Sequence, residues 1–296
     1  MKKVLVITGP TASGKSNFAV GLAKELGGEI ISGDSIQVYR GFDIGSGKIK
    51  EEEKQNIPHH LIDILSGHDR YNVMDFQQHA RKEIDECCSL PILCGGTGFY
   101  IRACLYDYSF EQDISEISFE GKTDEELYEE LKKVDPVQAE KIHPHNRRRI
   151  ERSLTIYQST GTPQSELEAK QKHEMIYDAY IVGCTMPREI LYQRIDERVE
   201  EMFNDGLEKE VNHLLEEGYT FDDPGMQGIG YKEFKLYKEE GASLEEVKVE
   251  IQKHSRQFAK RQYTWFNHQL PVHWLNMLEE KDIQKEKEEI KNWLNQ

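Results

Sequence analysis

The segment from Gly9 to Ser16, Gly-Pro-Thr-Ala-Ser-Gly-Lys-Ser, has the residue types and spacing of a phosphate-binding loop. Its glycines allow backbone N–H groups to converge on a phosphate, and the helix expected after it adds the partial positive charge of its N-terminus. Lys15 supplies a full positive charge, and the Ser16 hydroxyl is a ligand for Mg²⁺. The loop predicts a phosphate site formed by Gly9, Thr11, Ala12, Ser13, Gly14, Lys15 and Ser16.

A carboxylate follows the second apolar run of the chain, because residues 29–32 are followed by a glycine and then Asp34. In a parallel sheet the carboxyl ends of the strands meet at one edge, so Asp34 is expected to face whatever the loop holds. Hydrolysing P-loop enzymes need an Asp at the end of another strand, whereas the runs at 91–94 and 179–184 lead into a glycine and a threonine. Asp34 therefore suits a base that deprotonates an acceptor. A turn or helix-capping Asp is the alternative.

A second glycine-rich segment, Gly95-Gly96-Thr97-Gly98, follows the apolar run at 91–94. Glycine clusters leave room for a ligand to approach the backbone, and the Thr97 hydroxyl is a donor for a phosphate oxygen. Its position at a third strand end makes Thr97 a candidate contact. A purely structural turn is an equally good interpretation of this segment alone.

The elements that carry these residues are indicated by hydrophobic periodicity. Residues 4–8 form a short β-branched run, which predicts a buried strand, and from Ser16 apolar residues recur at helical spacing until Gly27. Similar apolar runs alternate with helix-like segments further along the chain. This alternation predicts an α/β fold in which helices flank both faces of a parallel sheet around the phosphate loop, a P-loop NTPase-like core.

Two later helices have clear boundaries in the sequence. Pro187 suits the first turn of an amphipathic helix that runs to Asp205 and stops at Gly206. Ser243 is expected to cap a further helix that lasts to about Tyr263.

Strand signals vanish between Cys104 and about Met175. Positions 107–130 hold ten acids and one lysine, whereas positions 131–153 hold seven basic residues against three acids. We interpret this stretch as a helical insertion, so that the predicted domains are a discontinuous core of residues 1–105 and 176–296 and an insertion of residues 106–175.

Composition narrows the class of protein. With 37% hydrophobic residues beside 31% charged ones, the 296-residue chain is too apolar to be disordered. Its net charge of −16 argues against non-specific coating of nucleic acid or acidic membranes. The first apolar stretch ends after five residues, so neither a signal peptide nor a membrane anchor is expected. Five cysteines without a CxxC pair predict reduced thiols, no zinc site and a cytoplasmic location.

Together these motifs resemble the tRNA dimethylallyltransferase (tRNA isopentenyltransferase) family. The resemblance covers about residues 1–268 and includes, beside the phosphate loop, the segments 34–39, 43–48, 58–63, 95–100, 149–165, 228–233 and 260–266. Two features depart from the family. Asn267 stands where a basic residue is common, so one phosphate contact is expected to be missing, and the zinc-finger extension of eukaryotic members is not expected, which fits the bacterial type.

The resemblance implies transfer of a dimethylallyl group from its diphosphate to the exocyclic amine of the adenosine just 3′ of the tRNA anticodon, with release of diphosphate. It implies that Lys15, Ser16 and Thr97 bind the diphosphate and its Mg²⁺, and that Asp34 accepts the amine proton. An arginine on the helix after Pro187 should join them, and we choose Arg198 over Arg194. Lys15, Thr97 and Asp34 are thus the predicted catalytic residues of a monomeric enzyme.

The resemblance also implies contacts with the anticodon stem-loop, at Asp34, Ser35, Ile36, Gln37 and Thr97 beside the nucleotide and at Arg148, Arg149 and Arg152 on the insertion. The sequence adds a second basic face, because three cations recur at helical spacing, at Lys253, Arg256 and Lys260. A merely solvated helical face is the alternative for both clusters.

Three rival functions remain open from the residues. A small-molecule kinase or an isopentenyltransferase acting on free adenine nucleotides would use the same loop, but neither needs an arginine-bearing insertion. A non-catalytic P-loop RNA-binding switch would not need Asp34 at a strand end.

Overall fold

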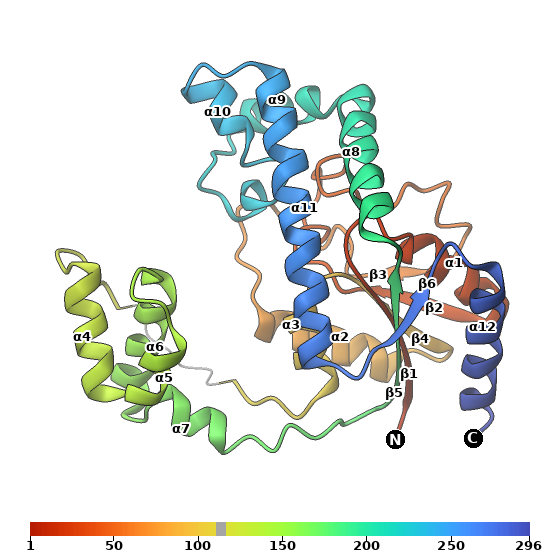
Figure 1. Cartoon of the computed structure of the whole chain (residues 1–296), viewed down its shortest axis with the longest axis horizontal. Helices are drawn as coiled ribbons and strands as arrows, with labels where there is room; N and C mark the ends of the chain where they lie inside the picture. The colour runs from red at the N-terminus through yellow and green to blue at the C-terminus, as the bar shows by residue number, and fades with distance from the viewer. Residues whose placement is uncertain (111–116) are drawn as a thin grey trace. The chain divides into compact units, whose positions relative to one another are not determined.

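The computed structural model describes residues 1–110 and 117–296 (Figure 1). The chain divides into two compact units, one of residues 1–106 with 175–296 and one of residues 107–174. Part of the predicted insertion, residues 111–116, lies outside the described residues.

The larger unit is built on one sheet whose described strands all pair in parallel, in the order β3-β2-β4-β1-β5-β6. The strands are β1 (Lys3–Thr8), β2 (Gly28–Ser32), β3 (His59–His60), β4 (Leu90–Cys94), β5 (Asp178–Thr185) and β6 (His273–Asn276). Both neighbours of β1 are in register with it, and Leu5 pairs with Ile92 on one side and Tyr180 on the other. The predicted α/β class with a parallel sheet is confirmed.

Alternate residues of β1 pack on opposite faces of the sheet, as the two-residue period of a strand requires. Val4 and Val6 join a core with α2 and α3, whereas Leu5 and Ile7 join a core with α1 and α12. Because both faces are covered, β1 is buried from Val4 to Thr8, and Val4 to Ile7 form a continuous apolar run. The covering helices are α1 (Lys15–Leu26), α2 (Val73–Glu86), α3 (Gly98–Leu105) and α12 (Glu280–Leu294).

The same unit contains a third apolar cluster, which the sequence did not separate from the sheet core. Loop residues such as Val38 and Phe42 pack there against Val211 and Ile251 of two helices. Its elements are α8 (Arg188–Asp205), α9 (Leu207–Glu216), the 3₁₀ turn η1 (Pro224–Gln227), α10 (Phe234–Glu239) and α11 (Leu244–Gln269).

The two later helices begin where the sequence predicted. Gly206 ends α8 in the left-handed conformation (φ 102°), and Ser243 caps α11 through reciprocal hydrogen bonds with Glu246. The predicted end of α11 near Tyr263 is wrong, since the helix continues to Gln269. Tertiary packing explains the extra turn, because Phe266 is fully buried in the sheet core and stabilises the helix beyond Tyr263.

The described part of residues 107–174 forms a small helical unit with its own core, in which Leu127 and Leu131 pack against Ile150 and Leu154. Its helices are α4 (Asp124–Val134), α5 (Pro136–Lys141), α6 (Arg147–Thr160) and α7 (Gln164–Ala169). Across the described chain, no helix combines the length and apolar content needed to cross a membrane.

Candidate active site at the carboxyl edge of the sheet

The predicted phosphate loop joins β1 to α1, and its conformation depends on glycine at both ends. Gly9 has a φ of 134°, and a Cβ there would lie 2.4 Å from the Cys184 carbonyl oxygen. Gly14 has a φ of 86° and precedes the first turn of α1. Residues other than glycine rarely adopt either conformation, so both glycines are needed for this path of the chain. The path leads into the first turn of α1, whose N–H groups have no partner within the helix and are open to a ligand.

Lys15 stands in the first turn of α1 and lines a cavity at the carboxyl edge of the sheet. Its Nζ lies 3.4 Å from the Pro10 carbonyl oxygen, a long hydrogen bond. Burial lowers the pKa of Lys15, and the nearby charge of Arg198 acts in the same direction. An anion in the cavity would relieve both effects, so the site is electrostatically suited to phosphate.

The cavity has a volume of about 340 Å³ and brings together residues far apart in the sequence. Predicted catalytic and binding residues that line it are Thr11, Lys15, Ser16, Asp34, Ser35, Ile36, Gln37, Thr97 and Arg198. Ala12 and Gly14 line a neighbouring hollow that also reaches Lys15 and Ser16. Gly9 and Ser13 lie in the loop itself, and the Ser13 Oγ is buried without a partner among the described residues.

Asp34 both caps a turn and faces the cavity. Its Oδ1 accepts the N–H groups of Ile36 at 2.9 Å and Gln37 at 3.3 Å, which is the turn-capping role kept open by the sequence. Its Oδ2 accepts no hydrogen bond from any described residue, while the side chain lines the cavity. One carboxylate oxygen therefore fixes the orientation, and the other is left to accept a proton.

Thr97 is held beside Asp34 by backbone hydrogen bonds. The Gly33 N–H donates to the Cys94 carbonyl at 2.7 Å, and the Thr97 N–H donates to the Gly33 carbonyl at 3.2 Å. A Cβ on Gly95 would lie 2.3 Å from the Gly33 oxygen, so only glycine permits this approach. The second glycine-rich segment is thus a tight structural turn that also lines the cavity.

Cys94 also lines the cavity, but its thiol is not suited to act as a nucleophile. Burial raises the pKa of the Cys94 thiol to about 11. The thiol is therefore neutral near pH 7 and is a poor nucleophile.

Arg198 and Arg194 occupy different places on α8. The Arg198 Nη2 donates to the Gly47 carbonyl at 3.0 Å, and the side chain lines the cavity. Burial lowers the pKa of Arg198, and the charge of Asp34 opposes that shift. Arg194 is exposed and lines the neighbouring hollow.

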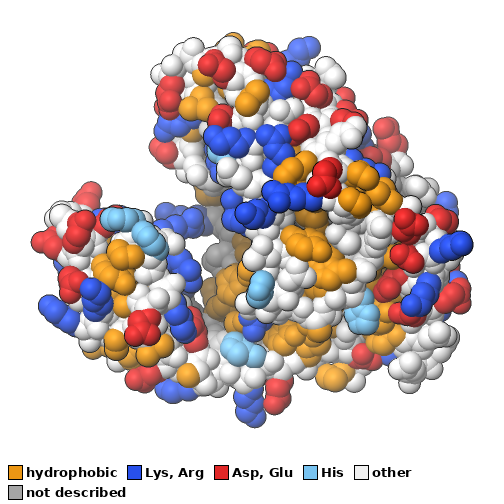
Figure 2. All heavy atoms as spheres, viewed as in Figure 1, with side chains coloured by type: hydrophobic (Ala, Val, Ile, Leu, Met, Phe, Trp, Pro, Cys, Tyr) orange, Lys and Arg blue, Asp and Glu red, His pale blue; other side chains and the backbone are white. Residues whose placement is uncertain are grey.

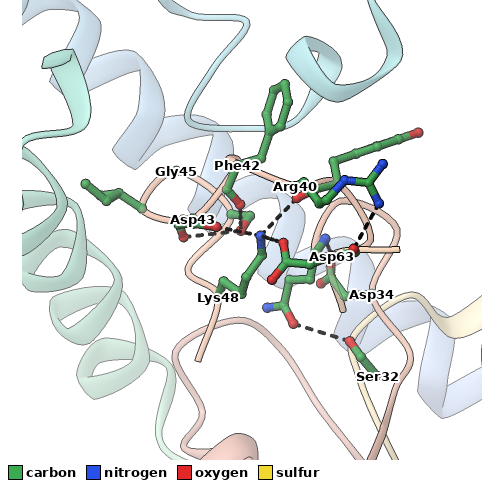
Figure 3. A network of polar contacts seen from close by, with 12 residues as sticks. Ser32, Asp34, Arg40, Phe42, Asp43, Gly45, Lys48 and Asp63 are labelled. Carbon is green, nitrogen blue, oxygen red and sulfur yellow. Dashed lines mark hydrogen bonds and ion pairs between the residues drawn. The ribbon is translucent and has the colours of Figure 1, made fainter. Parts of the chain in front are cut away.

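The loop that receives Arg198 is held by a network of polar contacts, and Figure 3 shows the part of it around Lys48, Asp43 and Asp63. The Glu210 carboxylate accepts three consecutive backbone N–H groups, at 3.2, 2.8 and 3.1 Å, from Asp43, Ile44 and Gly45. The Lys48 ammonium contacts Asp43 at 2.6 Å and Asp63 at 2.5 Å. These contacts hold the loop on both sides of Gly47, whose carbonyl accepts from Arg198.

The basic face of α11 differs from its prediction in detail. Lysines and arginines gather over the middle of α11 in Figure 2, yet Lys253 pairs with Glu250 at 2.9 Å, and Arg256 pairs with Asp196. Lys260 is exposed and forms no ion pair with a described residue. None of the three lines the cavity.

The arginines of α6 are divided in their roles. Arg147 pairs with Asp124 and Glu151, which ties the helical unit together. Arg148, Arg149 and Arg152 are exposed, and within residues 107–110 and 117–174 they form no ion pair.

Sequence reasoning missed three site residues. Gln262 and Arg261 line the cavity from α11, and Glu210 supports it from α9. The segment 260–266 carried a signal for the first two, because it belongs to the resemblance without an assigned role. Glu210 had no signal, since a lone Glu on an amphipathic helix has no distinguishing pattern.

A glycine-rich loop after β1, a lysine in the first turn of α1 and a carboxylate after β2, which β4 separates from β1 in the sheet, are the features of a P-loop protein with a phosphate-binding site. The sequence model of the IPP transferase family matches residues 37–269, and that of isopentenyl transferase matches residues 2–65. The chain belongs to the IPP transferase family, as its motifs indicated.

Relatives named tRNA dimethylallyltransferase match along nearly the whole chain. The tRNA dimethylallyltransferases of Anoxybacillus flavithermus and Geobacillus kaustophilus are each 44% identical, over 99% of this chain and 96% of the relative. A tRNA isopentenylpyrophosphate transferase from Staphylococcus epidermidis superposes with a TM-score of 0.73 at 39% identity, covering 100% of this chain and 99% of that one. A eukaryotic dimethylallyltransferase acting on tRNA gives a TM-score of 0.83 at 30% identity, over 94% and 75%. The core is therefore P-loop NTPase-like.

Proposed function

We propose that the chain transfers a dimethylallyl group from dimethylallyl diphosphate to the exocyclic amine of the adenosine 3′ of the anticodon in tRNA. The observation that carries the proposal is the cavity in which a carboxylate with one free oxygen, Asp34, faces the phosphate loop and two cations, Lys15 and Arg198. The names of the family's relatives supply the substrate class.

The diphosphate would bind at the phosphate loop. The N–H groups at the start of α1 and the charges of Lys15 and Arg198 would neutralise it, and the Thr97 hydroxyl would donate a further hydrogen bond. An allylic diphosphate ionises readily once its leaving group is neutralised, so these contacts act on the breaking C–O bond.

Mg²⁺, which the family implies, fits the donor set. The hydroxyl of Ser16 lines the cavity beside Lys15 and Asp34, and hydroxyl, carboxylate and phosphate oxygens are the hard ligands that Mg²⁺ prefers. When bound, the ion adds positive charge to the leaving diphosphate.

Asp34 would act as the base. As the adenosine amine forms its bond to the first carbon of the dimethylallyl group, the C–O bond to diphosphate breaks and diphosphate departs with the electron pair. The amine then carries an excess proton, which the free Oδ2 of Asp34 accepts. Bonds made and bonds broken balance without a further reactant.

The remaining walls of the cavity are suited to the two organic groups. Apolar side chains line one part of it, from Ile195, Val199, Met202, Ile229 and Ile251. The adenosine must leave its stack to enter, which is the usual solution for enzymes that modify a base. Ser35, Ile36 and Gln37, on the turn capped by Asp34, would contact this nucleotide.

The tRNA outside the cavity would meet cations on two helices, at the exposed Arg148, Arg149 and Arg152 on α6 and at the exposed Lys253 and Lys260 and the half-buried Arg256 on α11. The Asn267 Oδ1 accepts the Trp274 Nε1–H at 2.8 Å, so this side chain is used within the protein rather than as a phosphate contact. We propose that the enzyme works as a monomer, since one chain assembles the whole cavity. We also propose that it works in the cytoplasm, where the five free cysteines would stay reduced.

The proposal is tested by incubating tRNA with the protein, Mg²⁺ and dimethylallyl diphosphate, and then analysing the nucleosides by mass spectrometry. We expect one adenosine per tRNA to gain a dimethylallyl substituent on its base. A parallel reaction with ATP and adenosine tests the kinase alternative. Phosphorylated product there, with unmodified tRNA, would overturn the proposal.

A further inference from the structure

The side chain of Gln262 joins two loops that lie far apart in the sequence. Gln262 is only 6% exposed. Its Oε1 accepts the Thr11 N–H at 3.0 Å, and its Nε2 donates to the Gly96 carbonyl at 2.9 Å. One carboxamide therefore spans the phosphate loop, which carries Lys15, and the glycine-rich turn, which carries Thr97.

The chemistry of the partners fixes how the carboxamide is oriented. A backbone N–H needs an acceptor and a backbone carbonyl needs a donor, so the oxygen of Gln262 must face Thr11 and the nitrogen must face Gly96. Glutamine supplies both groups in one plane. A residue that lacks either group would leave a polar backbone atom without its partner.

The glycine-rich turn is shaped to receive α11. A Cβ on Gly96 would lie 2.2 Å from the Gln262 Nε2, and a Cβ on Gly98 would lie 2.2 Å from the Trp265 ring. Two glycines of the turn are thus needed for the close approach of two α11 side chains that lie three residues apart, on neighbouring positions of one helix face. The glycines of the turn and the side chains of α11 are therefore both suited to this contact.

We infer that Gln262 is a positioning residue for group transfer, which sets the separation between the Lys15 loop and the Thr97 turn. The inference rests on the proposed diphosphate site. Gln262 acts through its two backbone partners and not on the reacting atoms. Because misplacement by about 1 Å costs on the order of 10²-fold in rate, releasing one loop from the other should slow transfer.

The test compares Gln262→Met and Gln262→Glu in the full chain. The readouts are single-turnover transfer to an anticodon stem-loop, calorimetric binding of inorganic pyrophosphate, and thermal unfolding. We expect Gln262→Met to transfer roughly 10- to 100-fold more slowly per folded molecule, with stem-loop affinity within about twofold of wild type. Gln257→Met is the matched control, because Gln257 is exposed on the same helix, and it should behave as wild type.

Gln262→Glu supplies a signature that a merely structural role would not give. An ionised carboxylate accepts from Thr11 but repels the Gly96 carbonyl, whereas a protonated carboxyl donates to it. The wild type and the Gln262→Glu variant share the other titratable groups that line the cavity, so these groups affect both rates alike. They are His59, Lys15, Asp34, Cys94, Arg198, Lys232 and Arg261. The rate of Gln262→Glu relative to wild type should therefore rise as the pH falls, while the relative rate of Gln262→Met stays flat.

Three results would count against the inference. Transfer by folded Gln262→Met within about twofold of wild type overturns it, even if the diphosphate site is correct. If that variant does not fold, a flat relative pH profile for Gln262→Glu overturns it instead. Failure of the wild-type protein to bind pyrophosphate would contradict the diphosphate site itself, and the positioning role with it.

Discussion

The cavity in the sheet-containing unit and the outer face of α6 both carry charges assigned to the same reaction, but they are held differently. Lys15 and Arg198 are partly withdrawn from solvent and have their pKa values lowered by burial. Arg148 and Arg152 are exposed, although partial burial also lowers the pKa of Arg152, and among the described residues of their unit they form no ion pair. Charges in the cavity act at short range and depend on position, whereas exposed charges act through attraction that salt screens. Cavity variants should therefore alter chemistry, and α6 variants should alter affinity.

The largest effect should come from Asp34→Asn. The amide keeps an oxygen for the N–H groups of Ile36 and Gln37 but cannot accept the amine proton. We expect the single-turnover rate to fall by roughly 10² to 10⁴, with diphosphate and tRNA affinities within a few fold of wild type. Collapse of tRNA binding with intact chemistry would show that Asp34 recognises the nucleotide instead.

Lys15→Ala should come next. Removing a charge-assisted contact costs about 1.5 to 3 kcal/mol, which corresponds to roughly 10- to 150-fold in diphosphate affinity. Transfer at subsaturating diphosphate should fall in parallel, as titration calorimetry and initial rates would measure. An unchanged affinity would reduce the phosphate loop to a structural turn.

The pH dependence of diphosphate binding should reveal the titration of Lys15. Burial lowers its pKa in the free protein, and a bound anion raises it, so binding takes up a proton at alkaline pH. Affinity should be greatest below the lowered pKa and fall by up to about tenfold per pH unit above it. Lys15→Arg should flatten the profile, because a guanidinium does not titrate there. The same profile in both proteins would assign the titration to another group.

The smallest effect should come from exposed charges. For Arg148→Ala combined with Arg152→Ala, the slope of log affinity for the stem-loop against log salt should decrease by up to about two units, with pyrophosphate binding unchanged. Lys253→Ala with Arg256→Ala is the comparison, and it should change the slope less, because both cations already pair with acids. A larger change for the α11 pair would reverse the assignment of the two faces.

Much of the edge that carries the phosphate loop could be predicted because its signals are local. The β-branched run of β1, the glycines of the loop and the carboxylate after β2 each require only a few consecutive residues. The short strands β3 and β6, of two and four residues, gave no such signal.

What could not be predicted depends on contacts between distant segments. The partners of Gln262 lie 251 and 166 residues away, and Glu210 meets its three N–H groups through the packing of α9. Spacing predicted a basic face on α11, but whether Arg256 is free depends on Asp196, which belongs to another helix. Periodicity describes one element at a time, and these facts belong to pairs of elements.

The most direct test of the proposed site is a crystal structure of the protein with an anticodon stem-loop and an unreactive analogue of dimethylallyl diphosphate. The measured quantity is the distance from the amine of the target adenosine to the Asp34 Oδ2. We expect about 3 Å, with the diphosphate on the N–H groups at the start of α1 and on Lys15. An adenosine amine that lies beyond hydrogen-bond reach of Asp34, with the diphosphate correctly bound, would contradict the assignment of Asp34 as the base.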